Sequence, residues 1–475
     1  MRSSDGRLSP FLKASWGVGA IGTTSMLYLV NMFLVFFLVR HVGMPAAVAG
    51  SLLAVTRFYD AVIDPAIGTL SDRTQSRWGR RRPWLLVGAV LCPISCIAIF
   101  NPPIGLADGA LYTWMLVALL AYLTAYSLFS IPYMALGTEM SDDYGERASV
   151  MAYRTFFVYC SGLLVASGAP ALVELLGKDR AAYSSMSIAV GLLVGATMLW
   201  VVFFTGEARV TVRSRERVPF RLWWRSVLSN GYFLLILVTK MALQLGTAFQ
   251  GASMLFFMSY VLQKGEGALA LYGLISNVVG IATVPLWSRV LRSVERRPLF
   301  IALLAANAIG YLSWLLASPQ EPDAVLALRA ILLGAAGSGS VLVALAMLTD
   351  TIEYDRLRTG QRREGLFVGG FELVQTTSFV VGPLVVGFAF SAAGLKPGNV
   401  ALAAQPESAL TMMRVAVAVI PSACCLAGIL LLRLYRLDAG RLAALRDAHA
   451  ASNGPSAVAG AGAGSGTAPL PAAAR

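Results

Sequence analysis

Long apolar segments recur along the whole chain and restrict its fold more than any other feature. A helix needs about 17–25 residues to cross a bilayer. Inside hydrocarbon every backbone amide and carbonyl must be paired within the protein, so apolar segments of this length fold as helices. We predict an all-α polytopic membrane protein with twelve transmembrane helices near residues 11–40, 44–69, 83–101, 111–136, 149–173, 183–205, 230–262, 270–291, 299–317, 324–349, 366–394 and 408–433.

The composition supports a membrane protein. Of the 475 residues, 57% are hydrophobic and 13% are charged, whereas a soluble domain carries about 25% charged residues. The amino-terminal MRSSDGRLSPFLK is polar. The apolar run that follows it is too long for the core of a cleaved signal peptide. We therefore expect the first apolar segment to remain as a transmembrane helix.

The net charge of +13 reports topology rather than nucleic-acid binding. Basic residues gather in alternate loops of the predicted spans, at 73–82, 209–225, 289–297 and 356–363. This bias is the positive-inside rule, and it places both termini in the cytoplasm. Such clusters also attract anionic membrane lipid, so lipid is an expected partner and nucleic acid is not.

The residue types that carry most enzyme chemistry are sparse. The five cysteines all fall within predicted spans without a metal-binding spacing, and the only histidines are His41 and His449. A disulfide framework is not expected inside a bilayer. The sequence contains no nucleophile–base pair and no phosphate-binding loop. We expect no catalytic residues and no cofactor beyond a coupling ion.

The spans divide six and six. The amino-terminal half covers residues 1–206, a basic cytoplasmic linker covers 207–228, and the carboxyl-terminal half covers 229–436. The loop endings GRRRPWLL and VERRPLFI occupy matching places in the two halves. This layout is typical of the major facilitator fold, in which two pseudo-symmetric bundles enclose a midplane site. Residues 437–475 form a cytoplasmic tail that we expect to be disordered from about 451, where it becomes rich in Ala, Gly and Pro.

Ionisable side chains lie inside the second span. Such side chains are costly in hydrocarbon and usually line a substrate or ion path. Asp60 and Asp64 are four residues apart, so a helix places both carboxylates on one face. Carboxylates with hydroxyls or carbonyls nearby suit a hard cation that takes oxygen ligands. The alternative is that they pair with Arg57 or Arg154 to join two helices.

Several motifs resemble the glycoside–pentoside–hexuronide:cation symporters, the family that includes the melibiose permease. They are WGVGAIG from Trp16, R-x-x-D-x-x-x-D-P-x-x-G-x-x-x-D from Arg57, SIPYMALGTEMSDDYGERASVMAYRTFF from Ser130, and DTIEYDRLRTGQRREG from Asp350. The match covers most of residues 10–435. The resemblance implies the major facilitator fold, alternating access, and cation-coupled uptake of a small solute, commonly a sugar.

The resemblance also implies site residues. Asp60 and Asp64 match the family's sodium-site aspartates, and Ser127 lies where the family supplies a hydroxyl ligand. Thr24 and Ser130 stand where the melibiose permease has sugar-binding aspartates, the second of which also serves the cation site. Charge-assisted bonds are about twice as strong as neutral ones, so these hydroxyls disfavour a melibiose-like galactoside. Gln375 lies where the family has a lysine.

Further polar side chains are expected at the substrate cavity. Lys240 and Glu372 are charged residues within spans, and we expect both to face the cavity. The alternative is that Lys240 snorkels toward the membrane surface and that Glu372 belongs to the cytoplasmic gate. Arg154 resembles a cavity arginine of the family, with pairing to Asp60 or Asp64 as the alternative. On the first span, Tyr28 and Asn31 offer a ring and an amide one turn apart, with packing as the alternative reading.

Acids lie among the arginines at the predicted cytoplasmic ends. We interpret this arrangement as a gate of breakable ion pairs across the halves, because exposed pairs are individually worth about 0–1 kcal/mol. The alternative is that these charges only set the orientation of the protein in the membrane. That alternative explains the arginines but not the acids. The predicted gate consists of Asp72, Arg80, Arg81, Arg82, Asp350, Glu353, Arg362 and Arg363.

These observations predict a monomeric secondary transporter in a bacterial inner membrane. Sodium is favoured slightly over protons as the coupling ion, although two close carboxylates can also share a proton. A sugar or glycoside is the expected substrate through the resemblance. An amphipathic, lysolipid-like solute is the alternative substrate, and a membrane sensor that no longer transports is a more remote alternative.

Overall fold

The computed structural model describes residues 8–141, 144–206, 230–360, 364–400, 405–437 and 439–452. The first span is one continuous helix over Pro10–Val42, built from successive α and π segments. The amino-terminal half contains α1 Pro10–Gly17, α2 Gly19–Tyr28, η1 Leu29–Leu34, α3 Val35–Phe37, η2 Leu38–Val42, α4 Ala46–Arg73, α5 Arg82–Phe100, α6 Asp108–Glu139, α7 Tyr144–Ser161, η3 Gly162–Ser167, α8 Gly168–Leu175 and α9 Arg180–Phe204.

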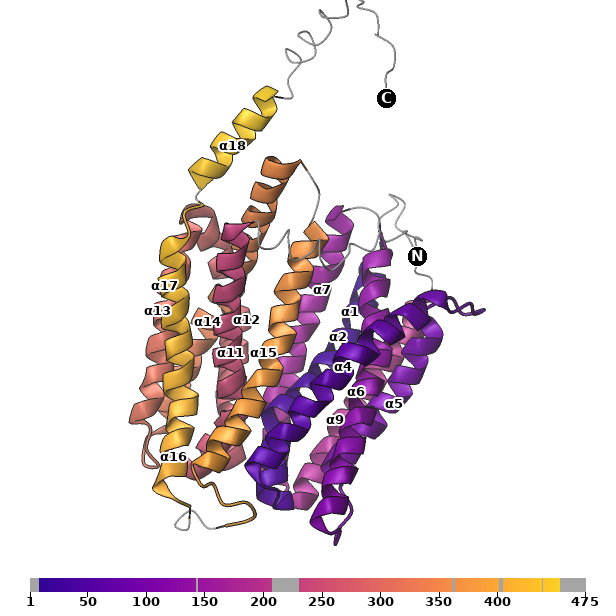
Figure 1. Cartoon of the computed structure of the whole chain (residues 1–475), viewed down its shortest axis with the longest axis vertical. Coiled ribbons are helices and arrows are strands. Elements are labelled where there is room, and N and C mark those ends of the chain that lie inside the picture. The colour runs from indigo at the N-terminus through magenta and orange to yellow at the C-terminus, as the bar shows by residue number, and fades with distance from the viewer. Residues whose placement is uncertain are drawn as a thin grey trace, which may run out of the picture.

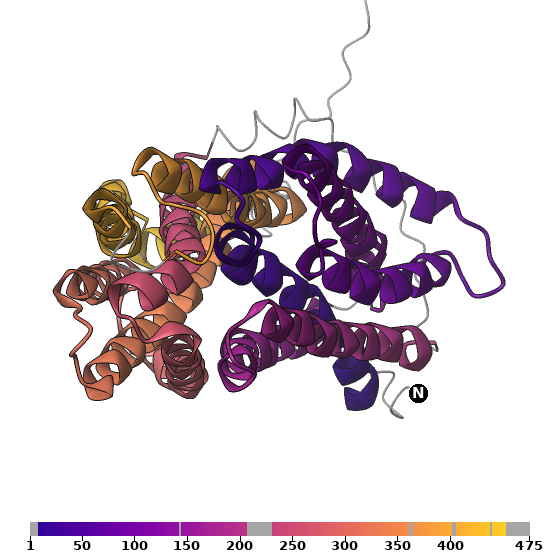
Figure 2. The ribbon, with the colours of Figure 1, turned by 90° about the horizontal axis from the view of Figure 1, so that it is seen from below.

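The carboxyl-terminal half repeats this pattern of long helices. It contains α11 Gly231–Phe256, η4 Phe257–Val261, α12 Gly265–Ser293, α13 Arg296–Leu312, η5 Ser313–Leu316, α14 Asp323–Thr359, α15 Glu364–Ala392, α16 Glu407–Arg414, η7 Val415–Val419 and α17 Ile420–Leu434. Figures 1 and 2 show the two halves as groups of helices side by side. Within the predicted tail, α18 spans Ala439–Ser452 and lies beside α14.

Ten helices of the described chain are long and apolar enough to cross a membrane. In α4 and α15, the described residues contain shorter apolar stretches, at Ala46–Thr56 and Val381–Ala392. The total of twelve spans, the domain boundaries and the disorder expected after about residue 451 remain predictions.

Apolar packing joins the two halves near one end of the molecule. We call the end of the molecule that carries α1 and α18 the terminal face, which is uppermost in Figure 1, and the other end the opposite face. Near the opposite face, the ring of Phe256 lies 5.0 Å from Phe36 of the amino half and 5.2 Å from Phe390 of its own half. All three belong to one buried cluster that spans both halves. A second cluster lies within the carboxyl half.

Candidate functional site

The predicted cation site lies where α4 packs against α6. Asp64 is exposed, and its Oδ1 accepts a hydrogen bond of 2.5 Å from the Ser127 hydroxyl. Asp60 is half-buried one turn earlier on α4, and Ser130 is half-buried one turn beyond Ser127 on α6. The structure therefore brings Asp64 and Ser127 into direct contact, and it keeps the other two predicted ligands on the same pair of helices.

A second hydrogen bond holds these two helices in register. The Tyr59 hydroxyl lies 2.7 Å from the Thr124 hydroxyl, about one turn from the Asp64–Ser127 bond. Helix α4 continues through Pro65 to Arg73. A proline inside a helix leaves one carbonyl without its usual amide donor. The site thus offers carboxylate, hydroxyl and carbonyl oxygens. A hard cation such as sodium takes oxygen ligands of these kinds, and a carboxylate can instead bind a proton.

The predicted residues of the first span lie along α2 and η1. Thr24, Tyr28 and Asn31 are each half-buried, and the Asn31 amide donates 2.9 Å to the Leu27 carbonyl of its own helix. A Cβ placed on Gly162 would lie 3.3 Å from the Tyr28 hydroxyl. Because glycine has no side chain, the Tyr28 hydroxyl can approach the junction of α7 and η3 at Gly162.

Asn277 of α12 is a polar residue that sequence reasoning missed. Its Oδ1 would lie 2.6 Å from a Cβ on Gly162, the same position that the Tyr28 hydroxyl approaches. Asn277 thus brings an amide from the carboxyl half to a tyrosine of the amino half. The available signal was a single asparagine inside an apolar span, which by itself does not distinguish a site from packing.

Arg154 is half-buried on α7 and lies beside the Tyr133 hydroxyl of α6. Tyr133 also donates 3.1 Å to the Trp16 carbonyl, and its ring stacks on Trp16 at 4.8 Å. Arg154 is therefore placed next to a packed aromatic pair that joins α1 to α6. Its predicted part in substrate binding stays a prediction.

Lys240 is 8% exposed on α11, and its ammonium is used to hold helices together. The Nζ donates 2.7 Å to the Phe371 carbonyl of α15 and lies 3.4 Å from the centroid of the Phe371 ring. These contacts favour helix packing over the predicted cavity role. Glu372 and Gln375 belong to α15, but their side chains lie outside the described part of the chain.

The predicted gate residues of the amino half form a compact charge network on the terminal face. Arg81 pairs with Asp72 at 3.0 Å and with Glu139 at the end of α6, and Arg80 pairs with Glu139 at 3.1 Å. Arg82 is half-buried at the start of α5. Glu139 lies in the motif GTEM but was not singled out from the sequence. It is the acid that both arginines share.

In the carboxyl half, Asp350 pairs with Arg296, the first residue of α13. Glu353 is half-buried one turn further along α14. The predicted partners Arg362 and Arg363 lie outside the described residues. The pairs of Asp72 and Asp350 described here lie within one half each, so the proposed pairing across the halves stays a prediction for another conformational state.

Contacts across the halves gather at the opposite face, which sequence reasoning did not identify. The Gly398 amide donates 2.7 Å to the Val39 carbonyl, and Arg40 donates 2.8 Å to the Tyr260 hydroxyl. These bonds link the end of the first span to the carboxyl half. No local pattern marks them, because their partners lie hundreds of residues apart.

The amino half contributes two further bonds of this kind. The Tyr183 hydroxyl donates 2.9 Å to Glu266 Oε1, and Glu174 Oε2 accepts 2.7 Å from the Gly267 amide. Backbones also meet closely here, since a Cβ on Gly387 of α15 would lie 2.5 Å from the Ala46 carbonyl oxygen. The protein is therefore closed on the opposite face.

Comparison with known proteins places this architecture among transporters. The family described as MFS/sugar transport protein matches residues 15–439. The uncharacterized symporter YnaJ of Bacillus subtilis is 28% identical over 440 residues, covering 91% of this chain and 93% of that protein. The isoprimeverose transporter of Lactiplantibacillus pentosus is 24% identical, covering 90% and 89%. The structure of a D-xylose-proton symporter superposes with a TM-score of 0.61 at 14% identity, covering 88% of this chain and 96% of that one.

Proposed function

Because the chain belongs to the MFS/sugar transport protein family, we propose that it is a secondary active transporter that carries a sugar or glycoside together with a cation. The observation that carries the proposal is the contact between Asp64 and Ser127 on two helices of the amino half. Membership of the family confirms the resemblance seen in the motifs and the expectation of a transporter rather than an enzyme.

Asp60 and Asp64 bind the coupling ion, with Ser127 and Ser130 as hydroxyl ligands. Either sodium or a proton fits this chemistry, since carboxylate and hydroxyl oxygens coordinate the first and close carboxylates share the second. Cation binding raises the affinity for substrate. By linkage, substrate raises the affinity for the cation by the same factor.

Alternating access follows from the arrangement of the halves. With the basic terminal face in the cytoplasm of a bacterial inner membrane, the structure corresponds to an inward-facing state that is closed on the outside by Arg40–Tyr260 and Tyr183–Glu266. Rocking of the halves breaks these contacts and brings the cytoplasmic charges of the two halves together.

The substrate class rests on the relatives. The isoprimeverose transporter is named for a sugar, and this favours a sugar over an amphipathic solute. Thr24 and Ser130 provide neutral hydroxyls, so we propose a sugar or glycoside other than a melibiose-like galactoside. Tyr28 and Asn277 meet near Gly162 and offer a hydroxyl and an amide for hydrogen bonds to sugar hydroxyls.

A ligand screen on the purified protein tests this proposal. Thermal stability is measured with sugars, glycosides and uronates, each with and without sodium and at two pH values. A ligand that binds only the folded protein raises stability by RT ln(1 + [L]/Kd). We expect one sugar whose stabilisation grows with the cation and is lost in Asp64→Asn. A stabilising sugar that responds neither to sodium nor to pH, in wild type and variant alike, would refute cation coupling.

A further inference from the structure

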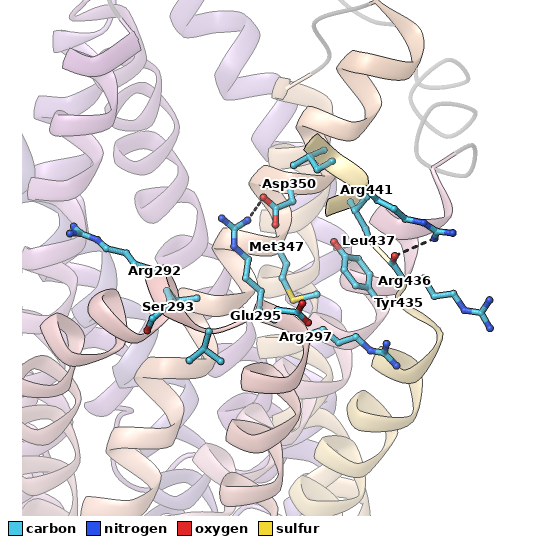
Figure 3. A pocket seen from close by; sticks show the side chains of 14 residues that line it. Arg292, Ser293, Glu295, Arg297, Met347, Asp350, Tyr435, Arg436, Leu437 and Arg441 are labelled. Carbon is cyan, nitrogen blue, oxygen red and sulfur yellow. Dashed lines mark hydrogen bonds and ion pairs between the residues drawn. The ribbon is translucent and has the colours of Figure 1, made fainter. Parts of the chain in front are cut away.

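In a pocket on the terminal face of the carboxyl half, several charged side chains are bound by other groups of the protein. Figure 3 shows Arg296 paired with Asp350 there. In the same pocket, Arg441 donates 3.3 Å to the Arg436 carbonyl and 3.3 Å to the Tyr232 hydroxyl. These contacts hold one end of the carboxyl half together. Polar groups that meet midway along the helices, where the two halves touch, are arranged differently.

Helix α12 of the carboxyl half packs against α8 and η3 of the amino half. A Cβ on Gly273 would lie 2.7 Å from the Ala166 carbonyl oxygen, so the two backbones are close there. One turn further along α12, the Asn277 side chain approaches Gly162, the first residue of η3. Beyond this point, the Trp287 indole of α12 donates 2.9 Å to a carbonyl of α14 in its own half. Asn277 therefore lies where α12 leaves the amino half.

The amide of Asn277 has a defined orientation. Its Nδ2 donates 2.9 Å to the Gly273 carbonyl of the same helix. A carbonyl oxygen can only accept, so the amide nitrogen faces Gly273 and Oδ1 faces Gly162. No described residue donates a hydrogen bond to this Oδ1. The side chain thus presents a fixed acceptor to the space between the halves.

The Tyr28 hydroxyl approaches the same point from the amino half. It would lie 3.3 Å from a Cβ on Gly162, and it makes no hydrogen bond within the part of the chain that the structure describes. Both Tyr28 and Asn277 are half-buried. Tyr28 directly precedes the π-helical segment η1, and Gly162 begins the π-helical segment η3. Such segments within α-helices are frequent at functional sites.

These two groups are complementary to a sugar hydroxyl. A sugar hydroxyl can donate to Asn277 Oδ1 and accept from the Tyr28 hydroxyl at the same time. The carboxylate of a uronide can only accept, so it would face Asn277 Oδ1 with no proton between the two oxygens. An acceptor that meets an acceptor disfavours that ligand, and specificity often depends on such a mismatch.

The basic side chains described within the spans lie elsewhere. The Lys240 ammonium is bound to the Phe371 carbonyl. Arg154 lies beside Tyr133 and eight positions before Gly162 along α7, which is roughly 12 Å along a helix axis. Neither residue places a cation where Tyr28 and Asn277 meet. The arrangement at Gly162 therefore favours an uncharged group of the substrate.

We propose that Asn277 is a specificity-determining residue, which accepts a hydrogen bond from a hydroxyl of the transported solute and selects neutral glycosides against uronides. The Tyr28 hydroxyl donates to the same substrate oxygen, so the bound sugar connects the first span to α12. Gly162 leaves the space that this hydroxyl occupies. This assignment rests on the transport function proposed above and narrows its substrate class.

Binding to the purified full-length protein tests the assignment by isothermal titration calorimetry. The probes are methyl glycosides of glucose, galactose and mannose, each compared with the methyl uronide that differs from it only at C6. Each titration is done with and without sodium and at two pH values. Asn277→Leu removes the acceptor, whereas Asn277→Asp keeps an acceptor oxygen as the conservative variant. Melting curves show whether each variant is folded.

Gly162→Ala is a second test that leaves Asn277 in the chain. Its Cβ would lie 2.6 Å from Asn277 Oδ1 and would fill the space assigned to the sugar hydroxyl. Gly168→Ala is the matched control, because a Cβ on this first residue of α8 has nothing within 4 Å.

We expect wild type to bind at least one neutral glycoside about tenfold or more tightly than its uronide. Loss of one hydrogen bond should weaken binding of that glycoside about five- to tenfold in Asn277→Leu and in Gly162→Ala. Uronide binding should change by less than about twofold in Asn277→Leu, so the preference shrinks. Asn277→Asp should retain the neutral glycoside within about threefold, and Gly168→Ala should match wild type.

Three results would overturn the assignment: a uronide that wild type binds as tightly as its neutral partner, no binding of any neutral glycoside, or an unchanged preference in folded Asn277→Leu. Cation coupling is judged separately. Binding of a neutral glycoside that depends on Asn277 but not on sodium, pH or Asp64 would support this assignment and refute symport. Cation-dependent binding of a uronide as the tightest ligand would support symport and refute this assignment.

Discussion

Asp64 and Lys240 are both charges within apolar spans, yet the structure places them in different surroundings. Asp64 is exposed, and its carboxylate accepts a hydrogen bond from Ser127 of a neighbouring helix. Lys240 is buried and donates to a backbone carbonyl above an aromatic ring. Protein contacts offset the cost of each charge in hydrocarbon, and the proposed coupling cation would add to them at Asp64.

Removing the Asp64 carboxylate should abolish the response to the coupling cation. Hydrogen bonds and contacts to a charged group are worth about 1.5–3 kcal/mol, so Asp64→Asn should weaken cation binding tenfold or more. Ser127→Ala should have a smaller effect of the same kind, because the carboxylate remains. The cation concentration for half-maximal uptake measures both.

Tyr59→Phe is the matched control for this pair. It breaks the neighbouring hydrogen bond to Thr124 between α4 and α6, but it leaves both carboxylates in place. Cation dependence should stay within about twofold of wild type. If Tyr59→Phe and Asp64→Asn change cation dependence equally, then helix packing rather than ligation explains the role of Asp64.

Lys240→Gln should act on stability rather than on substrate binding. The change removes a charged donor to the Phe371 carbonyl and a cation–π contact, a loss of about 1.5–3 kcal/mol in the free energy of unfolding. The melting temperature of the purified protein should fall, while KM for the transported sugar stays within about threefold. Met241→Leu alters the next, exposed residue and should change neither. A large rise in KM at unchanged stability would instead support the cavity role.

At the scale of helices, two sets of contacts between the halves define the conformational state of the molecule. Helix α4 packs against α15, and α12 packs against α8 and η3. Glycines allow this approach, since Gly50 of α4 lies against the backbone at Gly387 of α15. The long apolar segments predicted the helices themselves. They contain no information on which ends of the two halves touch, because that depends on the conformational state.

A side chain at Gly387 should therefore prevent closure on the opposite face. A Cβ there would lie 2.5 Å from the Ala46 carbonyl oxygen and 3.0 Å from the Gly50 Cα, neither of which is a flexible side-chain end. Gly387→Val should separate the halves on that face and stop transport. Spin labels at Leu106, in the loop between α5 and α6, and at Leu316, the last residue of η5, report the change as a longer distance.

Gly369→Ala provides the control on the same helix, because a Cβ at Gly369 has nothing within 4 Å. It should preserve both transport and the distance between the labels. Unchanged label distances in Gly387→Val would contradict the interpretation that this contact closes the opposite face.

For the whole molecule, the sequence predicted the helical membrane fold and the family. It selected Asp72 and Arg81 as gate residues, but it predicted ion pairs across the halves rather than the pair that these two residues form within one half. The partner of Asp350 was not predicted, since Arg296 lies on another helix. The contacts Arg40–Tyr260 and Tyr183–Glu266 join residues 220 and 83 positions apart. Such distant contacts follow from tertiary packing, which no local pattern encodes.

Transport by the purified protein in proteoliposomes tests the central claim of cation-coupled symport most directly. The sugar identified by the stability screen is placed outside, and an inward gradient of sodium or of protons is imposed in turn. We predict that one of the two gradients drives accumulation above the external concentration, and that Asp64→Asn abolishes this accumulation. Uptake that stops at equal concentrations under both gradients, in wild type and variant alike, would contradict the account and identify a uniporter.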